Sequence, residues 1–170
     1  MEKNSTTKTL TLSLAIIILW LSLYRVHFGI YAHCPISSRL LYSFFHASFF
    51  HALTNVWCLL SLVFINNMTL RDILIAYLIA LSFPVDTLCP LFPILHQPTV
   101  GLSGLCFALF GIYSSRVYYK WRFHLYIIFF LALTSLAPQL NTPLHLWSYL
   151  VGILFSHLPK IFFLFKRYTK

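Results

Sequence analysis

The sequence predicts an all-α, polytopic membrane protein. Apolar residues make up 59% of the 170 positions and charged residues only 9%, whereas a soluble domain carries about 25% charged residues. The mean hydropathy is +0.81. The apolar stretches lack the two-residue alternation of barrel strands, and only helices and closed barrels satisfy the backbone in lipid. Disordered, coiled-coil, collagen-like and small disulfide-rich chains are excluded by the same composition.

Six apolar runs predict six transmembrane helices in one domain over residues 1–170. The first has a basic flank, but no small-residue cleavage site follows it, so it is interpreted as a retained anchor. Pro84 lies near the end of the third run, a proline-rich connection follows it, and Pro138 closes the fifth. The expected spans are residues 9–24, 41–65, 70–88, 101–119, 123–137 and 143–165.

The basic residues predict that both termini lie in the cytoplasm. With that orientation only two of the twelve Lys and Arg residues, Arg25 and Arg39, lie outside. The other ten lie inside, as the positive-inside rule requires for an even number of spans. They are Lys3, Lys8, Arg71, Arg116, Lys120, Arg122, Lys160, Lys166, Arg167 and Lys170. The net charge of +9 does not indicate a nucleic-acid partner, because these residues fall singly between apolar runs instead of clustering.

Polar residues inside three spans are candidates for a functional site, because such residues are costly in lipid. The second, fourth and sixth spans descend from the outside, and each carries its polar group in its first half. The three groups are therefore expected at one depth in the outer leaflet. Ser103 lies thirteen residues before Arg116, which places it roughly 10 Å below the outer surface of a hydrocarbon core about 30 Å thick. The irregular chain above it then requires a water-filled cavity or burial in protein. The groups are His46, His51 and Asn55; Gly101, Ser103 and Gly104; and His145, Ser148 and Gly152.

Small residues at helical spacing predict that the fourth and sixth spans pack closely. His145, Ser148 and Gly152 share one face of the sixth span, and the fourth presents a second small-residue stripe, which allows membrane helices to approach. That stripe consists of Gly104, Ala108 and Gly111. His51 and Asn55 share a face of the second span, and His46 is rotated roughly 140° away from them.

Other interpretations of these residues remain open at this point. A serine in an apolar helix often bonds only to a backbone carbonyl, and buried histidines often serve as structural partners. A metal could use His46, His51 and His145, but the sequence has no HExxH motif. Cys34 and Cys89 lie in outside loops, where a disulfide is chemically permitted. No role is assigned to five further histidines: His27, His33, His96, His124 and His157.

The three motifs together resemble those of the rhomboid family of intramembrane serine proteases. The second span reads His46-Ala-Ser-Phe-Phe-His51-Ala-Leu-Thr-Asn55, the fourth begins Gly101-Leu-Ser103-Gly104, and the sixth carries His145. Gly111 follows the serine by eight residues, and Gly152 follows His145 by seven. The order matches that family over residues 43–155. The resemblance implies that Ser103 is the nucleophile and His145 its base. It also implies an oxyanion site from His51, Asn55 and Ser103, and structural support from His46, Gly101, Gly104, Gly111 and Gly152.

The resemblance implies an endopeptidase that cleaves transmembrane or membrane-proximal segments of other proteins. Peptide hydrolysis needs a nucleophile, a base and an oxyanion site, and nothing places Asp86 or another carboxylate at His145, so a Ser–His dyad is expected. No cofactor or metal is expected, the partners are protein substrates and the bilayer, and the location is the cell (inner) membrane. Ser148 replaces a glycine common in that family, and the first outer loop, about residues 25–40, is short and lacks the usual Trp-Arg pair. An inactive, client-binding member of the family and a small transporter are the alternatives.

Overall fold

The structure, a computed structural model, is all-α and so confirms the predicted fold class. It describes residues 2–24, 28–137 and 139–168, and the side chains of 5–24, 28–137 and 139–158. Pro138, Arg25 and His27, named above, lie outside the described residues. The only strand-like pairing in the described chain is a bridge between Ile30 and Thr99. The helices are α1 (Glu2–Leu21), α2 (Ile36–Leu41), η1 (Tyr42–Phe44), α3 (Phe49–Phe64), α4 (Leu70–Leu81), α5 (Val85–Leu88), η2 (Pro93–His96), α6 (Ser103–Tyr113), α7 (Lys120–Ser135) and α8 (Thr142–Tyr168).

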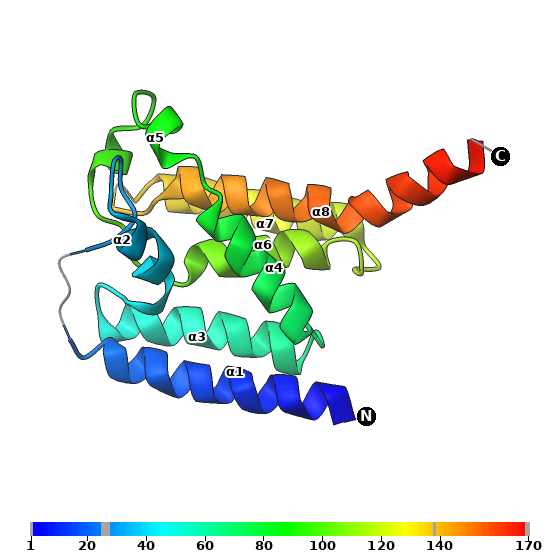
Figure 1. The fold of residues 1–170 in the computed structure, drawn as a ribbon, viewed down its shortest axis with the longest axis horizontal. Helices are drawn as coiled ribbons and strands as arrows, with labels where there is room; N and C mark the ends of the chain where they lie inside the picture. The colour runs from blue at the N-terminus through cyan, green and yellow to red at the C-terminus, as the bar shows by residue number, and fades with distance from the viewer. Residues whose placement is uncertain (1, 25–27, 138, 169–170) are drawn as a thin grey trace.

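The long helices alternate in direction (Figure 1). Helices α3, α6 and α8 all begin at the left-hand end of that view, the end that also holds α2 and α5, whereas α1, α4 and α7 run the other way. Helix α1 begins and helix α8 ends at the right-hand end of the view. The polar residues near the starts of α3, α6 and α8 therefore gather at one end of the bundle.

The prediction that the second span forms one continuous helix was wrong. Its residues form two helical segments, Ile36–Phe44 and Phe49–Phe64, which are bent by 77°. The break has a local cause, because the Ser48 side chain accepts a hydrogen bond from the His51 backbone N–H and caps α3. Within the described residues, only these two segments taken together are long and apolar enough to cross a bilayer, and no single helix is.

Two other predicted spans are shorter than expected. The third ends as a helix at Leu81, because Pro84 follows and disfavours helical backbone before it. Thr69 and Asp72 begin the same helix with a capping box. The fourth ends at Tyr113, and Arg116 leaves the helix to pair with the Asp72 carboxylate at 2.7 and 3.0 Å.

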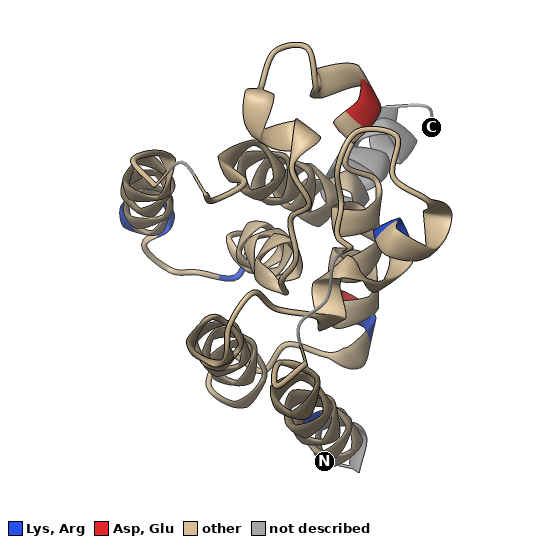
Figure 2. Ribbon diagram, turned by 90° about the vertical axis from the view of Figure 1, so that its left-hand side faces the viewer, with Lys and Arg blue, Asp and Glu red and all other residues tan. Residues whose placement is uncertain are grey.

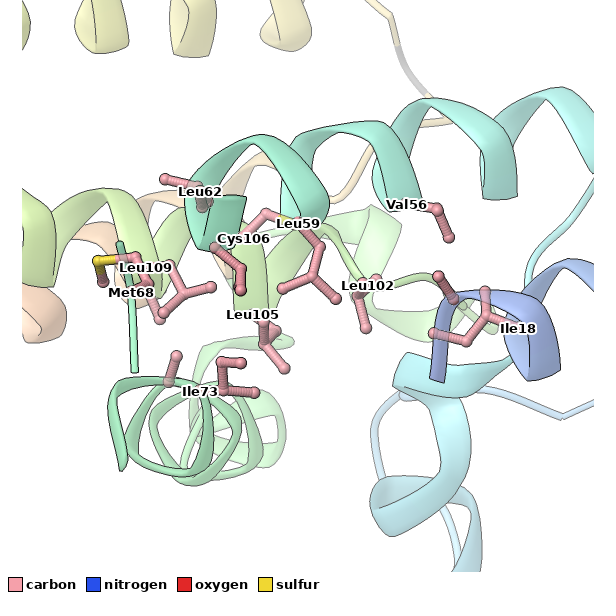
Figure 3. Close-up of a cluster of buried hydrophobic side chains, with 14 of the residues drawn as sticks. Ile18, Val56, Leu59, Leu62, Met68, Ile73, Leu102, Leu105, Cys106 and Leu109 are labelled. Carbon is pink, nitrogen blue, oxygen red and sulfur yellow. The ribbon is translucent and has the colours of Figure 1, made fainter. Parts of the chain in front are cut away.

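The main apolar core lies between α1, α3, α4 and α6. Figure 3 shows side chains from these helices meeting around Leu59, Leu105 and Leu109, each at most 2% exposed. A second cluster packs the loops over the starts of α6 and α8, with Tyr42, Phe83 and Leu95 fully buried. The start of α6 is therefore held by apolar packing on two sides.

Helices α6 and α8 touch backbone to backbone at two glycines. A Cβ on Gly111 would lie 2.3 Å from the Tyr149 carbonyl oxygen, and one on Gly152 would lie 2.5 Å from the Ala108 carbonyl oxygen. Real Cβ atoms do not approach backbone so closely, so any larger residue forces the helices apart. This contact brings α8 against α6 two turns below the residues that face each other at their starts.

Charged residues are few and scattered in the described chain, as the small number of blue and red segments in Figure 2 shows. The two carboxylates whose side chains are described both have cationic partners. Asp72 pairs with Arg116, and Asp86 pairs with Arg39 at 2.8 Å. The His33 backbone N–H, at 2.6 Å, and the Arg39 guanidinium hold the pKa of the Asp86 carboxyl below its usual range. Asp86 thus ties α2 and the loop before it to α5.

Candidate active site

Ser103 and His145 lie in contact at the starts of two adjacent helices. Ser103 is the first residue of α6 and His145 lies in the first turn of α8. The His145 Nε2 atom is 2.8 Å from the Ser103 Oγ atom, which is hydrogen-bond distance. His145 is only 4% exposed. The arrangement has the geometry of a serine whose hydroxyl proton is within reach of a base.

Phe107 holds the plane of the His145 ring. The two rings are stacked with centroids 4.6 Å apart and planes 18° apart. Phe107 follows Ser103 by four residues, so one helical turn places it on the same face of α6. The sequence analysis did not identify this residue. Its spacing from Ser103 was the available indication, but a phenylalanine in an apolar helix usually serves only as packing.

No described carboxylate orients the other side of the imidazole. The His145 Nδ1 atom is buried and has no hydrogen-bond partner among the described residues. Asp72 and Asp86 pair with Arg116 and Arg39. Within the described side chains, the site therefore holds a Ser–His pair without an acidic third member.

His51 and Asn55 line the same site from α3. The Asn55 Nδ2 group donates one hydrogen bond to the His51 carbonyl oxygen at 3.0 Å, which leaves its second hydrogen for another acceptor. Gly101 adopts a φ of +134°, and a Cβ there would lie 2.9 Å from the His51 ring. Glycine at this position therefore lets the His51 side chain approach the start of α6.

His46 does not point away from His51, and that prediction was wrong. It rested on a continuous helix, but α3 begins only at Phe49, so His46 lies in the extended break before it. Its ring packs edge-on against the His51 ring with centroids 5.1 Å apart. Its Nε2 atom accepts a hydrogen bond from the Leu102 backbone N–H at 3.2 Å. His46 therefore anchors the backbone residue directly before Ser103.

A cavity of about 460 Å³ opens at the Ser–His pair between α3, α6, α7 and α8. His51, Asn55, Ser103 and His145 all line it, and most of the remaining wall is apolar. Helix α7 contributes one side, which the sequence analysis did not assign to the site. The α7 residues in the wall are Tyr126, Ile127, Phe130 and Thr134.

The remaining candidates lie apart from the Ser–His pair or have other partners. His124 bonds to the Tyr149 hydroxyl at 2.6 Å, and His33 lies beside Asp86 in the loop before α2. All four cysteines are free thiols, Cys34 and Cys89 included. Within the described residues, no three His, Cys, Asp or Glu side chains group into a metal site.

Comparison with known proteins identifies the family. Residues 35–164 match the Rhomboid domain, and this segment contains Ser103, His145 and all the residues that line their cavity. No curated protein and no solved structure gave a match. The matched segment covers more than half of the chain, and the chain therefore belongs to the rhomboid family of membrane proteins.

Proposed function

We propose that this protein is an intramembrane serine endopeptidase that uses Ser103 and His145 as a catalytic dyad. The observation that carries the proposal is the 2.8 Å contact between Ser103 Oγ and His145 Nε2. The contact lies on the wall of a largely apolar cavity. Membership of the rhomboid family supports the same activity.

The proposed reaction has two steps. Ser103 Oγ attacks the scissile carbonyl carbon while His145 Nε2 takes the hydroxyl proton and then gives it to the leaving amine. A water molecule, deprotonated by the same nitrogen, then attacks the acyl-enzyme ester, and the serine leaves with that proton. Stacking on Phe107 supports this role, because it keeps Nε2 aimed at Ser103 through both proton transfers.

The oxyanion formed in each step needs positive charge or hydrogen-bond donors. Ser103 lies at the first position of α6, where backbone N–H groups have no partner within the helix. The second hydrogen of Asn55 Nδ2 and the ring of His51 lie on the same cavity wall. We assign these three groups to the oxyanion site.

The proposed substrates are transmembrane or membrane-proximal segments of other proteins. The eleven residues of α6 extend about 16 Å at 1.5 Å per residue, roughly half of a 30 Å hydrocarbon core. A serine at the start of so short a helix lies well below the membrane surface when the other end is at the opposite surface. The apolar α7 wall suits an apolar peptide that has unwound to expose its backbone.

The proposed topology is six spans with both termini in the cytoplasm. A variant without native cysteines, carrying single cysteines at residues 39, 118 or 170, should react with an impermeant thiol reagent in intact cells only at residue 39. Permeabilised cells, in which all three sites should react, provide the control. Labelling of residue 170 from outside would contradict the topology and the common depth of the site.

A fluorophosphonate probe tests the proposed function directly, because it forms a covalent bond only with an activated serine. We expect the purified protein to be labelled and the label to map to Ser103. Heat-denatured protein provides the control and should not react. An inactive, client-binding protein would bind membrane proteins without reacting with the probe, and complete absence of labelling would favour that alternative.

A further inference from the structure

Ser148 has a buried hydroxyl group that no described contact explains. The residue is 0% exposed, and its Oγ atom has no hydrogen-bond partner among the described residues. Other helix serines donate to a backbone carbonyl one turn earlier, namely Ser114, Ser135 and Ser156. Leaving a buried hydroxyl without a partner destabilises a fold, so this hydroxyl should have another use.

His145 carries the matching unpartnered atom. Its Nδ1 is also buried without a partner, although Nε2 is held by Ser103. Ser148 follows His145 by three residues on α8, and side chains at this spacing are neighbours, with Cβ atoms about 5–6 Å apart. That separation suits a hydrogen bond made directly, once the Ser148 hydroxyl turns toward Nδ1, or one made through a buried water.

The chemistry of the dyad requires an acceptor at Nδ1. For Nε2 to accept the Ser103 proton, the neutral ring must carry its own proton on Nδ1. When Nε2 is protonated, the Nδ1–H group becomes a stronger donor. A hydroxyl oxygen accepts such a bond, as a carboxylate does in a conventional triad.

We propose that Ser148 is the positioning residue of the dyad: its hydroxyl accepts the Nδ1–H hydrogen bond of His145, directly or through one water, and holds the ring in the reactive tautomer. This inference rests on the proposed function. Thr142, three residues before His145, also has a buried unpartnered hydroxyl. It lines a different cavity, one of about 560 Å³, which does not include Ser103 or His145.

Three variants separate positioning from packing. Ser148→Ala removes the acceptor and leaves a space smaller than a water molecule, so kcat should fall about tenfold with KM unchanged. Ser148→Gly leaves space for a water that replaces the hydroxyl, so kcat should stay within about threefold of wild type. The thermal midpoint should show the opposite order, because glycine destabilises a helix relative to alanine. Thr142→Val provides the matched control and should keep wild-type kcat.

The pH dependence of kcat/KM gives a readout that packing alone does not move. The acceptor favours the protonated ring, so in Ser148→Ala the acid limb should move to lower pH by up to about one unit. The other titratable side chains around the cavity stay unchanged in these variants; they are His51, Cys58, Cys106 and Tyr126.

Each outcome has one meaning for Ser148. Wild-type kcat and pH dependence in Ser148→Ala would overturn the proposal, and so would equal losses of kcat in the alanine and glycine variants. The same loss in Thr142→Val would assign the role to Thr142 instead. Failure of the proposed function is distinguishable, because wild-type protein would then not react with the fluorophosphonate probe at all.

Discussion

Replacing Ser103 or His145 by alanine is expected to reduce the proposed cleavage by on the order of 10⁴- to 10⁶-fold, the range known for serine proteases with a catalytic triad. The physical reason is the 2.8 Å contact between Ser103 Oγ and His145 Nε2, through which the serine loses its proton as it attacks. Because the two groups act as a unit, the double variant should be no slower than either single variant. Turnover of a transmembrane substrate by purified protein, in detergent or vesicles, measures this effect.

Two matched variants guard against a loss that comes only from misfolding. Ser114→Ala removes another buried serine hydroxyl, one at the opposite end of α6 that bonds to the Gly111 carbonyl oxygen. His124→Ala removes a histidine that bonds to Tyr149, outside the cavity. Both should keep most of the activity. Substantial cleavage by Ser103→Ala would refute the nucleophile assignment.

Asn55→Ala and His51→Ala are expected to slow cleavage on the order of 100-fold, because each removes one oxyanion donor. The Ser103 backbone N–H and the other side chain remain, so the effect should lie at the low end of the range for such donors. The developing charge exists only in the transition state. The loss should therefore appear in kcat with little change in KM, and fluorophosphonate labelling of Ser103 should persist at a reduced rate.

Thr54→Val is the matched control for Asn55→Ala. The Thr54 hydroxyl and the Asn55 amide donate to the same His51 carbonyl oxygen, each at 3.0 Å. Both variants lose that hydrogen bond, but only Asn55 is assigned to the oxyanion. If Asn55→Ala keeps full turnover and only its melting temperature falls, as expected for Thr54→Val, the oxyanion role must be withdrawn. His46→Ala should lower both the turnover and the melting temperature, because His46 anchors the Leu102 backbone and packs on His51.

The motif residues could be identified from the sequence because their types and spacing are local properties. Ser103 follows a glycine before an apolar run, and His145 shares a helical face with Gly152. The proximity of these two residues could be predicted because both of their helices carry stripes of small residues that allow close packing. The all-α fold likewise followed from the sequence. Too few charged residues are present to cover the surface of a water-soluble protein, and the apolar runs lack the alternation of barrel strands.

The position of His46 could not be predicted in the same way. Apolar periodicity continues from residue 41 to residue 65, and nothing in it marks the 77° bend. The bend depends on Ser48 acting as a cap instead of an interior helix residue. Phe107 and the α7 wall were missed for a related reason: apolar side chains that face a cavity are chemically identical to those that face lipid.

The glycine contact between α6 and α8 fixes the angle between these helices at a point far from Ser103. Gly111 lies eight residues from Ser103, about 12 Å along the helix. A tilt of one degree at that contact moves the serine by about 0.2 Å, and five degrees by about 1 Å, a displacement that can cost 100-fold in rate. The proton-transfer distance is therefore set at a point remote from the chemistry. For the proposed protease, this means that a movement admitting a substrate would have to leave α6 and α8 in place and involve the elements around them.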